Sequence, residues 1–222
     1  MDIKLKSFIK LAELFESHGY HLYLVGGSVR DYLLNLPLTD MDVVTDATPE
    51  DEKTFLPNAD YTFEKYGSIK YQFEGIKFDI TTLRKETGYN DSRHPSKVEY
   101  TDKLDEDVNR RDITINALYM TKELKIVDLI GGLHDLEHKL IKIIGNPDVR
   151  FKEDPLRIIR LLRFKADLNF EIENKTLESI KSHISYIYLL NKDKVHQEIK
   201  KCRNQSKLIS ELESFGIIIN NN

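Results

Sequence analysis

The sequence lacks the features that would place the chain in a membrane or outside the cell. It has a single cysteine, Cys202, in 222 residues. No disulfide can therefore form within the chain, and a reducing, cytoplasmic location is expected. No apolar run approaches the roughly 20 residues that a transmembrane helix needs, so no membrane partner is expected. Residues 1–19 mix charged and apolar residues at helical spacing, which predicts an amphipathic helix ending at Gly19 and not a signal peptide.

The chain also lacks the excess of positive charge that is typical of a generally basic nucleic-acid-binding surface. Its net charge is −4. Residues 1–140 contain 18 basic and 26 acidic residues, a net charge of −8, whereas residues 141–222 contain 15 and 11, a net charge of +4. This asymmetry favours two domains with different roles, although a drift in surface composition would give the same counts.

Strand and turn signals are concentrated in the first part of the chain. Segments 21–27, 39–45 and 68–83 have the composition or alternation of strands, and the last of them predicts a hairpin that turns at Glu74 and Gly75. Residues 28–36 are typical of a helix. From about residue 133 to residue 215 the pattern is helical and almost free of glycine. The sequence therefore predicts an α+β domain followed by a helical module.

The stretch "GGSVRDYLLNLPLTDMDVVT", residues 26–45, combines two local motifs. Gly26 and Gly27 lie between a strand and a helix, where backbone N–H groups can approach a phosphate and Arg30 can add positive charge. Asp40 and Asp42 are two residues apart on a predicted strand, so both carboxylates point to one face and can bind a hard cation such as Mg²⁺. Each motif alone is common in ordinary turns and solvated strands. Together they predict metal-assisted chemistry on a nucleoside triphosphate.

A third carboxylate, Asp79, lies in the predicted hairpin. In "IKFDIT" the apolar residues alternate with polar ones, so Asp79 lies on the polar face. An isolated aspartate there would simply face solvent. Beside an Asp-x-Asp strand it is the expected third acid, which would hold a second metal or take the proton of an attacking hydroxyl in an in-line displacement.

The segment "EDPLRIIRLLRF" places Arg157, Arg160 and Arg163 at every third position of a predicted helix. An arginine stripe is usually a solvated surface. Asp154, one turn before Arg157, favours a more specific interpretation, because a carboxylate accepts hydrogen bonds and a guanidinium donates them. Cytosine and adenine both offer an amino donor beside a ring-nitrogen acceptor, which this pair would complement. Uracil and guanine offer the reverse pattern and would leave buried polar groups unpaired.

Four segments together carry a family resemblance: "YLVGGSVRDYLLNLPLTDMDVVTDATPE", "KFDITTLR", "NRRDITINALYM" and "EDPLRIIRLLRF". In order and spacing, from about residue 22 to residue 198, they resemble the bacterial class II tRNA nucleotidyltransferases, the CCA-adding enzymes. These belong to the polymerase-β-like nucleotidyltransferase and poly(A) polymerase superfamily. The resemblance implies a catalytic head with a mixed sheet and flanking helices over residues 1–138. It also implies an all-helical, nucleotide-selecting neck over 139–203 and a short C-terminal helical remnant over 204–222.

The resemblance implies template-independent addition of CCA to the 3′ end of tRNA, from CTP and ATP with Mg²⁺ and with release of pyrophosphate. The expected partner is the acceptor end of tRNA, and the expected state is a monomer or a dimer. The implied nucleotide-binding residues are Gly26, Gly27 and Arg30 at the triphosphate, Arg111 and Asp112 at the sugar, Asp154 and Arg157 at the base, with Arg160 and Arg163 on the same helix. The implied catalytic residues are Asp40, Asp42 and Asp79, of which Asp40 and Asp42 bind metal.

Residues 85–100, "KETGYNDSRHPSKVEY", are turn-rich and without clear periodicity, which predicts a long loop that is a lid or disordered. In the resembling family a flexible loop here helps the change from adding C to adding A, and enzymes that add only CC have it shortened. Its full length therefore favours complete CCA addition. "FEKYGSIKY" stands where poly(A) polymerases carry a basic "GRRF"-like signature, which favours CCA addition over poly(A) synthesis.

The C-terminal part departs from the family pattern. Asp193 and Lys194 stand where the family has Glu and Arg, and only about twenty residues follow, in place of the helical domains that hold the tRNA. A minimal enzyme, a fragment and one subunit of a split A-adding or CC-adding system all stay open. A catalytically silent RNA-binding module is disfavoured because it would not need all three aspartates. His134 and His138 in "HDLEH" are interpreted as a surface pair without a third metal ligand, and His94 as a loop residue.

Overall fold

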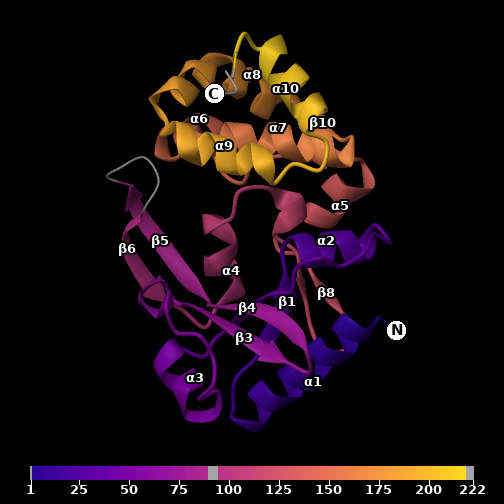
Figure 1. Ribbon diagram of the computed structural model, residues 1–222, viewed down its shortest axis with the longest axis vertical. Helices are drawn as coiled ribbons and strands as arrows, with labels where there is room; N and C mark the ends of the chain where they lie inside the picture. Colours follow the sequence, from indigo (N-terminus) through magenta and orange to yellow (C-terminus); the bar gives the residue numbers. More distant parts are fainter. Residues whose placement is uncertain (1, 90–94, 219–222) are drawn as a thin grey trace. The chain divides into compact units, whose positions relative to one another are not determined.

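The computed structural model describes residues 2–89 and 95–218 (Figure 1). The chain forms two compact units. Unit 1 comprises residues 1–88, 96–111 and 115–133, and unit 2 consists mainly of residues 134–222 together with residues 112–114. The two units are described separately.

Unit 1 is built on a mixed six-stranded sheet with the strand order β3-β4-β2-β1-β7-β8. The strands are β1 (Leu22–Val25), β2 (Asp42–Thr45), β3 (Ser68–Phe73), β4 (Ile76–Thr82), β7 (Tyr119–Met120) and β8 (Ile126–Val127). β2 and β4 are parallel, while the other neighbouring pairs are antiparallel. The predicted hairpin is confirmed, and Glu74 and Gly75 at its turn have φ angles of 48° and 80°. A single parallel pair inside the sheet brings the polar ends of β2 and β4 to one edge.

Helices flank this sheet. They are α1 (Ile3–Ser17), α2 (Gly27–Leu33), α3 (Pro49–Phe55) and α4 (Leu104–Asp107), with short 3₁₀ segments at Glu64–Tyr66, Val108–Arg110 and Thr114–Asn116. α1 is amphipathic as predicted and ends two residues before Gly19; its Phe8, Leu11 and Phe15 are fully buried. α3 begins with a capping box between Thr48 and Asp51. The apolar faces of these helices close the core on the sheet.

Residues 85–100 do not form the long loop that the sequence predicted. β5 (Arg84–Tyr89) and β6 (Pro95–Tyr100) pair as a two-stranded sheet, and residues 90–94, including His94, lie outside the described residues. Residues 97–100 lack the alternation of buried and exposed side chains that is typical of a half-buried strand, because all four are exposed or half-buried.

Unit 2 is helical apart from one small sheet. Its helices are α6 (Pro147–Glu153), α7 (Leu156–Leu168), α8 (Asn174–His183), α9 (Lys192–Lys200) and α10 (Gln205–Ser214), and a 3₁₀ segment covers Ile184–Leu189 (Figure 1). α5 (Gly132–Glu137) precedes them. β9 (Leu140–Ile141) and β10 (Glu171–Ile172) form a parallel pair too short to give a periodic signal in the sequence. One face of α7 packs into the core of unit 2, since Ile158, Leu161 and Leu162 are fully buried.

Over the described residues, no helix is both long and apolar enough to span a lipid bilayer.

Candidate functional site

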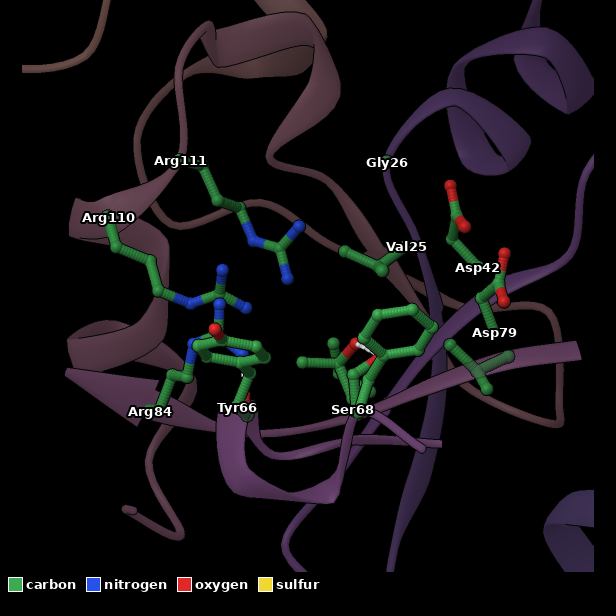
Figure 2. Close-up of a pocket in the computed structure, with 13 residues that line it drawn as sticks. Val25, Gly26, Asp42, Tyr66, Ser68, Asp79, Arg84, Arg110 and Arg111 are labelled. Carbon is green, nitrogen blue, oxygen red and sulfur yellow. Dashed lines mark hydrogen bonds between the residues drawn. The ribbon is translucent and has the colours of Figure 1, made fainter. Parts of the chain in front are cut away.

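A pocket of about 380 Å³ opens on the sheet of unit 1 (Figure 2). In Figure 2 the carboxylates of Asp42 and Asp79 lie at one end, and Arg84, Arg110 and Arg111 lie at the other. The remaining lining residues are Val25, Gly26, Val43, Val44, Phe63, Tyr66, Ser68 and Thr81. The pocket therefore presents opposite charges at its two ends, a polarity that suits a ligand with both metal-binding and anionic groups.

Asp42 and Asp79 are brought together by strand register. β2 and β4 are parallel neighbours, and Asp42 lies directly opposite Asp79. Residues in register on adjacent strands point to the same face of a sheet. Burial raises the pKa of Asp42 to about 6, with further contributions from the negative charges of Asp79 and Asp40, while Arg111 acts in the opposite direction. A cation bound beside Asp42 would favour its ionised form and so act against this shift.

The sequence predicts both members of the Asp-x-Asp motif on a strand. Asp42 begins β2, but Asp40 lies before it. Its backbone carbonyl accepts a hydrogen bond of 2.7 Å from the Ser28 hydroxyl, and that hydroxyl lies 3.4 Å from the backbone N–H of Asp42. The beginning of α2 therefore fixes this backbone. The carboxylate of Asp40 is close enough for its charge to act on Asp42.

The donor set fits Mg²⁺ that shares its coordination with a substrate. Over residues 2–89 and 95–218, no three carboxylate, imidazole or thiolate side chains stand ready to bind a metal ion by themselves. Mg²⁺ is commonly bound through one or two carboxylates, with waters and substrate phosphates supplying the other ligands. Asp40 and Asp42 would be those carboxylates.

The turn at Gly26 and Gly27 places backbone without side chains beside the Asp42 carboxylate. Gly26 has φ = 74°, which disfavours any residue with a side chain. A Cβ at this position would lie 4.0 Å from Oδ2 of Asp42 and 4.0 Å from the carbonyl oxygen of Asn116. Glycine therefore keeps the space beside the Asp42 carboxylate open for a ligand.

Arg30 lies one turn further along α2 and is buried. Its Nε and Nη2 donate to Oδ1 of Asp31 at 2.9 and 2.7 Å, and its Nη1 donates to Oδ1 of Asn116 at 2.6 Å. A Cβ on Gly27 would be 3.5 Å from Nη2 of Arg30. In this arrangement Arg30 holds the base of the glycine turn, and its contact with a phosphate stays a prediction.

At the other end of the pocket, two arginines are held by one buried acid. Asp107 is fully buried and accepts from Arg110 at 2.7 Å and from Arg111 at 2.7 Å; the Tyr119 hydroxyl also donates to it at 2.9 Å. Burial opposes ionisation of Asp107, but the two guanidinium groups outweigh it and lower its pKa to about 2. Asp107 therefore fixes Arg111, the predicted sugar-contacting residue, in a single orientation.

Arg84 completes this end of the pocket. It binds Glu86 through Nε at 2.9 Å and Nη2 at 2.8 Å, and Glu86 lies 3.8 Å from Arg110. Sequence reasoning missed both Arg84 and Arg110. Arg110 adjoins the motif that identified Arg111 and could have been found there, whereas the partners of Arg84 are set by the β5–β6 strands that the sequence did not predict.

The remaining predicted site residues, Asp112, Asp154, Arg157, Arg160 and Arg163, lie in unit 2. Oδ2 of Asp112 accepts from Nε and Nη2 of Arg160 at 2.8 and 2.5 Å, and its Oδ1 accepts from the Ile113 backbone N–H at 2.9 Å. Burial opposes ionisation of Asp112, but the Arg160 charge outweighs it and lowers its pKa. Arg160 and Asp112 are thus a tightly paired acid and base.

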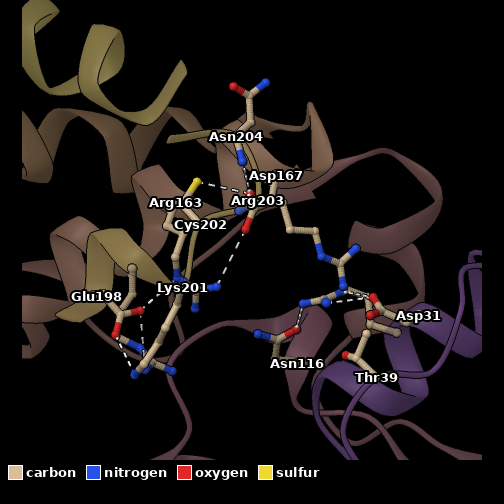
Figure 3. Close-up of polar contacts among 12 residues, drawn as sticks. Asp31, Thr39, Asn116, Arg163, Asp167, Glu198, Lys201, Cys202, Arg203 and Asn204 are labelled. Carbon is tan, nitrogen blue, oxygen red and sulfur yellow. Dashed lines mark hydrogen bonds and ion pairs between the residues drawn. The ribbon is translucent and has the colours of Figure 1, made fainter. Parts of the chain in front are cut away.

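Glu198 on α9 binds the next arginine of the stripe (Figure 3). This carboxylate is 2% exposed and accepts from Nε of Arg163 at 2.8 Å and from Lys201 at 3.0 Å, with Arg160 at 3.9 Å. Burial opposes its ionisation, but the charges of Arg160 and Arg163 lower its pKa. The predicted cationic stripe on α7 is therefore compensated by buried acids and is no bare cationic surface.

Asp154 and Arg157 flank the start of α7. Oδ1 of Asp154 accepts from the Leu156 backbone N–H at 3.0 Å, which caps the helix. Nη1 of Arg157 donates to the Arg150 carbonyl at 2.9 Å and to Oε2 of Glu153 at 3.0 Å. Both groups are thus held by neighbours within unit 2, as a pair that reads hydrogen-bond patterns requires.

His134 and His138 stack with their ring centroids 4.2 Å apart. His138 Nδ1 lies 2.9 Å from the carbonyl oxygen of His134, and His134 Nδ1 lies 3.4 Å from a carboxylate oxygen of Asp135. This geometry is that of a surface ring pair at the end of α5.

Comparisons with known proteins agree with the geometry of unit 1. The family model of the poly A polymerase head domain matches residues 22–142. The chain is 39% identical over 208 residues to a CCA-adding enzyme of Staphylococcus saprophyticus, which covers 92% of this chain and 52% of the relative. It is 42% identical over 179 residues to a CCA-adding enzyme of Bacillus licheniformis, covering 81% and 45%. The chain spans about half the length of the curated relatives it matches.

Solved structures give the same result. The crystal structure of the Bacillus stearothermophilus CCA-adding enzyme in complex with CTP superposes with a TM-score of 0.87 at 28% identity, covering 96% of this chain and 53% of the other. The Thermotoga maritima CCA-adding enzyme complexed with tRNA superposes with a TM-score of 0.77 at 26% identity, covering 97% and 52%. The sequence-based prediction of fold and family is confirmed: the chain belongs to the family of the poly A polymerase head domain.

Proposed function

We propose that the chain catalyses template-independent addition of C, C and A to the 3′ end of tRNA, using CTP and ATP and releasing pyrophosphate. The observation that carries the proposal is the pairing of Asp42 with Asp79 in register, beside the bare backbone of Gly26. This carboxylate pair lies in a chain about 40% identical to CCA-adding enzymes over most of its length. Two carboxylates on one face of a sheet, next to a turn without side chains, suit metal-assisted nucleotidyl transfer.

In this proposal the residues of unit 1 act on the reacting groups. The backbone at Gly26 and Gly27 receives the triphosphate, and Arg111, held by Asp107, contacts the sugar. The 3′-hydroxyl of the RNA attacks the α-phosphorus, the bond to the leaving pyrophosphate breaks, and Asp79 takes the hydroxyl proton. Asp40 and Asp42 would hold Mg²⁺, which supplies charge neutralisation at the phosphates when it is bound.

The residues of unit 2 choose the nucleotide. Asp154 accepts from the amino group of cytosine or adenine, and Arg157 donates to the neighbouring ring nitrogen. Asp112 contacts the nucleotide sugar. Arg160 and Arg163 hold Asp112 and α9 in place through their ion pairs with Asp112 and Glu198. Selection of two bases by one acid–arginine pair explains how addition proceeds without a nucleic-acid template.

The test is incubation of the chain with tRNA transcripts that lack one, two or three terminal nucleotides, with each nucleoside triphosphate supplied separately. We expect C on the two shorter transcripts, A on the transcript that ends in CC, and nothing from UTP or GTP. Addition of A alone or of C alone would replace the proposal with a partial activity. Unlimited addition of A would indicate a poly(A) polymerase, and binding without incorporation would indicate a silent RNA-binding module.

A further inference from the structure

Two aromatic side chains on the pocket wall are used neither by the core nor by the proposed chemistry. Phe63 and Tyr66, here called the aromatic pair, line the pocket, yet each is 47% exposed. Exposed aromatic rings grouped at a pocket mark an interaction surface more often than chance exposure does. The sequence around them, "TFEKYGS", gives no periodic signal, and their position on the pocket wall appears only in the fold.

The backbone that carries the aromatic pair is held in place. Arg84 donates through Nη1 to the Tyr66 carbonyl, and the Tyr100 hydroxyl donates to the Glu64 carbonyl at 3.4 Å. Gly67 has φ = 71°, and a Cβ there would lie only 2.7 Å from Cε1 of Tyr100. Tyr100 therefore packs directly on the backbone of Gly67. Exposed rings on a fixed backbone bind a flat partner with little loss of conformational entropy.

The charge beside the aromatic pair suits an anion. In Figure 2 Tyr66 lies beside Arg84 and next to Arg110, at the end of the pocket away from Asp42 and Asp79. The guanidinium groups of Arg84, Arg110 and Arg111 line this end of the pocket and bind Glu86 and Asp107, and Lys65 Nζ lies 4.8 Å from the centroid of the Tyr66 ring. Aromatic rings beside a positively charged groove are the usual means of binding single-stranded nucleic acid.

We propose that the aromatic pair stacks on the last bases of a single-stranded RNA 3′ end, whose phosphates contact the arginines at the same end of the pocket. The inference rests on the proposed function and names the part of the RNA that this pocket binds. RNA bound in this way would direct its terminal hydroxyl toward the carboxylates of Asp42 and Asp79 across the pocket.

Stacking suits the RNA end better than it suits the incoming nucleotide. The incoming base must be discriminated, and the proposed function gives that task to the hydrogen-bonding groups of Asp154 and Arg157. The RNA end changes its last base after each addition. Stacking tolerates such changes, because every base offers a π-face.

The first experiment uses the absence of tryptophan from the chain. Tyr66→Trp creates a single-tryptophan protein, whose indole fluorescence is quenched when a base stacks on it. We expect a six-nucleotide RNA ending in CC to quench this fluorescence without added metal, and CTP or ATP alone to leave it unchanged. Leu129→Trp, at a residue of unit 1 that is 42% exposed and does not line the pocket, is the matched control and should not respond.

The second experiment measures RNA affinity by fluorescence anisotropy with the same oligonucleotide. Loss of both rings in Phe63→Leu/Tyr66→Leu should weaken binding about tenfold or more, because stacking on each ring contributes measurably. Tyr66→Phe keeps a ring and should bind as the wild type does. The KM for CTP should be unchanged in the double variant, and thermal unfolding of each variant checks the fold.

Two results would overturn the inference. If CTP alone quenches the indole of the Tyr66→Trp variant to the same extent as RNA does, the aromatic pair belongs to the incoming nucleotide. RNA affinity that is unchanged in a folded double-leucine variant would exclude a stacking role. Because the binding assays need no turnover, the two hypotheses can fail separately. Normal incorporation without quenching would contradict this inference alone. Quenching without incorporation would contradict the proposed function alone.

Discussion

Asp42 in unit 1 and Glu198 in unit 2 are carboxylates in polar clusters, but their pKa values shift in opposite directions. Burial raises the pKa of half-buried Asp42 to about 6, and its acidic neighbours Asp79 and Asp40 add to the effect. Glu198 is more deeply buried, yet the charges of Arg160 and Arg163 overcome burial and lower its pKa. Burial opposes ionisation of both carboxylates; the neighbouring acids add to this effect at Asp42, whereas the neighbouring guanidinium groups outweigh it at Glu198.

This contrast separates a reacting site from a scaffold. Two acids held close together repel each other when both are ionised, an electrostatic cost that a bound cation would reduce. A buried acid paired with guanidinium groups holds those side chains in place, because their charges largely compensate each other. On this basis we propose that a metal and phosphates bind in the pocket of unit 1 and that the ion pairs on α7 hold the groups that select the nucleotide.

The largest expected effect comes from removing the uncompensated acid. Asp42→Ala should lower nucleotide incorporation by about a thousandfold or more, equivalent to about 4 kcal/mol of transition-state stabilisation. The variant should unfold at the same temperature as the wild type or a higher one, because repulsion from Asp79 is relieved. Radiolabelled incorporation and thermal unfolding measure the two effects, and Asp102→Ala, at an exposed aspartate of unit 1, is the control. Near-normal incorporation by folded Asp42→Ala would remove the site assignment.

The converse is expected for the compensated acid. Glu198→Ala leaves Arg163 and Arg160 without their shared carboxylate and should lower the free energy of unfolding by about 3–5 kcal/mol. Urea denaturation measures this loss. Glu213→Ala, at an exposed glutamate on α10, should change it by less than about 0.5 kcal/mol. If the two variants are equally stable, the α7 ion pairs do not form the scaffold.

A second uncompensated acid in unit 1 tests the electrostatic cost away from the pocket. Glu52 is 1% exposed, and its Oε1 has no hydrogen-bond partner among the residues that the structure describes. Burial raises its pKa from 4.5 to about 8, with a smaller contribution from Asp51. In the unfolded chain Glu52 ionises near pH 4.5. The folded state therefore loses relative stability as the pH rises from about 4.5 to 8, by at most about 1.4 kcal/mol per pH unit.

Glu52→Gln should abolish this part of the pH dependence. The variant and the wild type should have similar free energies of unfolding at pH 5, and the variant should be the more stable at pH 9. Urea denaturation at both values measures the difference, with Glu50→Gln as the control because that neighbouring side chain is exposed. Parallel pH profiles for Glu52→Gln and the wild type would show that Glu52 is ionised in the folded protein at no cost.

Local patterns predicted the residues to which we assign the chemistry, but not the partners that hold them. The alternation in 76–81 placed Asp79 on the polar face, and the Asp-x-Asp spacing identified Asp40 and Asp42. The sequence could not show that Arg160 binds Asp112, 48 residues away, or that Arg163 binds Glu198, 35 residues away. Such pairs are set by helix packing, which leaves no local periodicity.

Secondary structure shows the same division. The Glu74–Gly75 hairpin and the buried face of α7 were predictable because one apolar face repeats along each element. β5 and β6 were missed because the sequence of 85–100 shows no clear periodicity, and the side chains of 97–100 are all exposed or half-buried. α3 was missed although Thr48, Pro49 and Asp51 carry a helix-start signal, which was available in the sequence and was not used.

The smallest expected effect concerns base selection at Asp154. Because Asp154 also caps α7, Asp154→Ala removes both the cap and the base contact, whereas Asp154→Asn keeps an oxygen that can accept from the Leu156 N–H. The asparagine amide also offers a donor where the carboxylate only accepts. Both variants should therefore admit UTP or GTP, and the ratio of kcat/KM for CTP over UTP should fall by about five- to 150-fold, or about 1–3 kcal/mol. Competition assays with all four triphosphates measure this ratio.

Arg157 keeps its contacts with Glu153 and the Arg150 carbonyl in both variants, so α7 should stay in place. If Asp154→Asn retains wild-type selectivity while Asp154→Ala loses it, Asp154 acts as the helix cap and not as the acceptor that reads the base; if neither variant changes selectivity, the base is selected elsewhere in the protein.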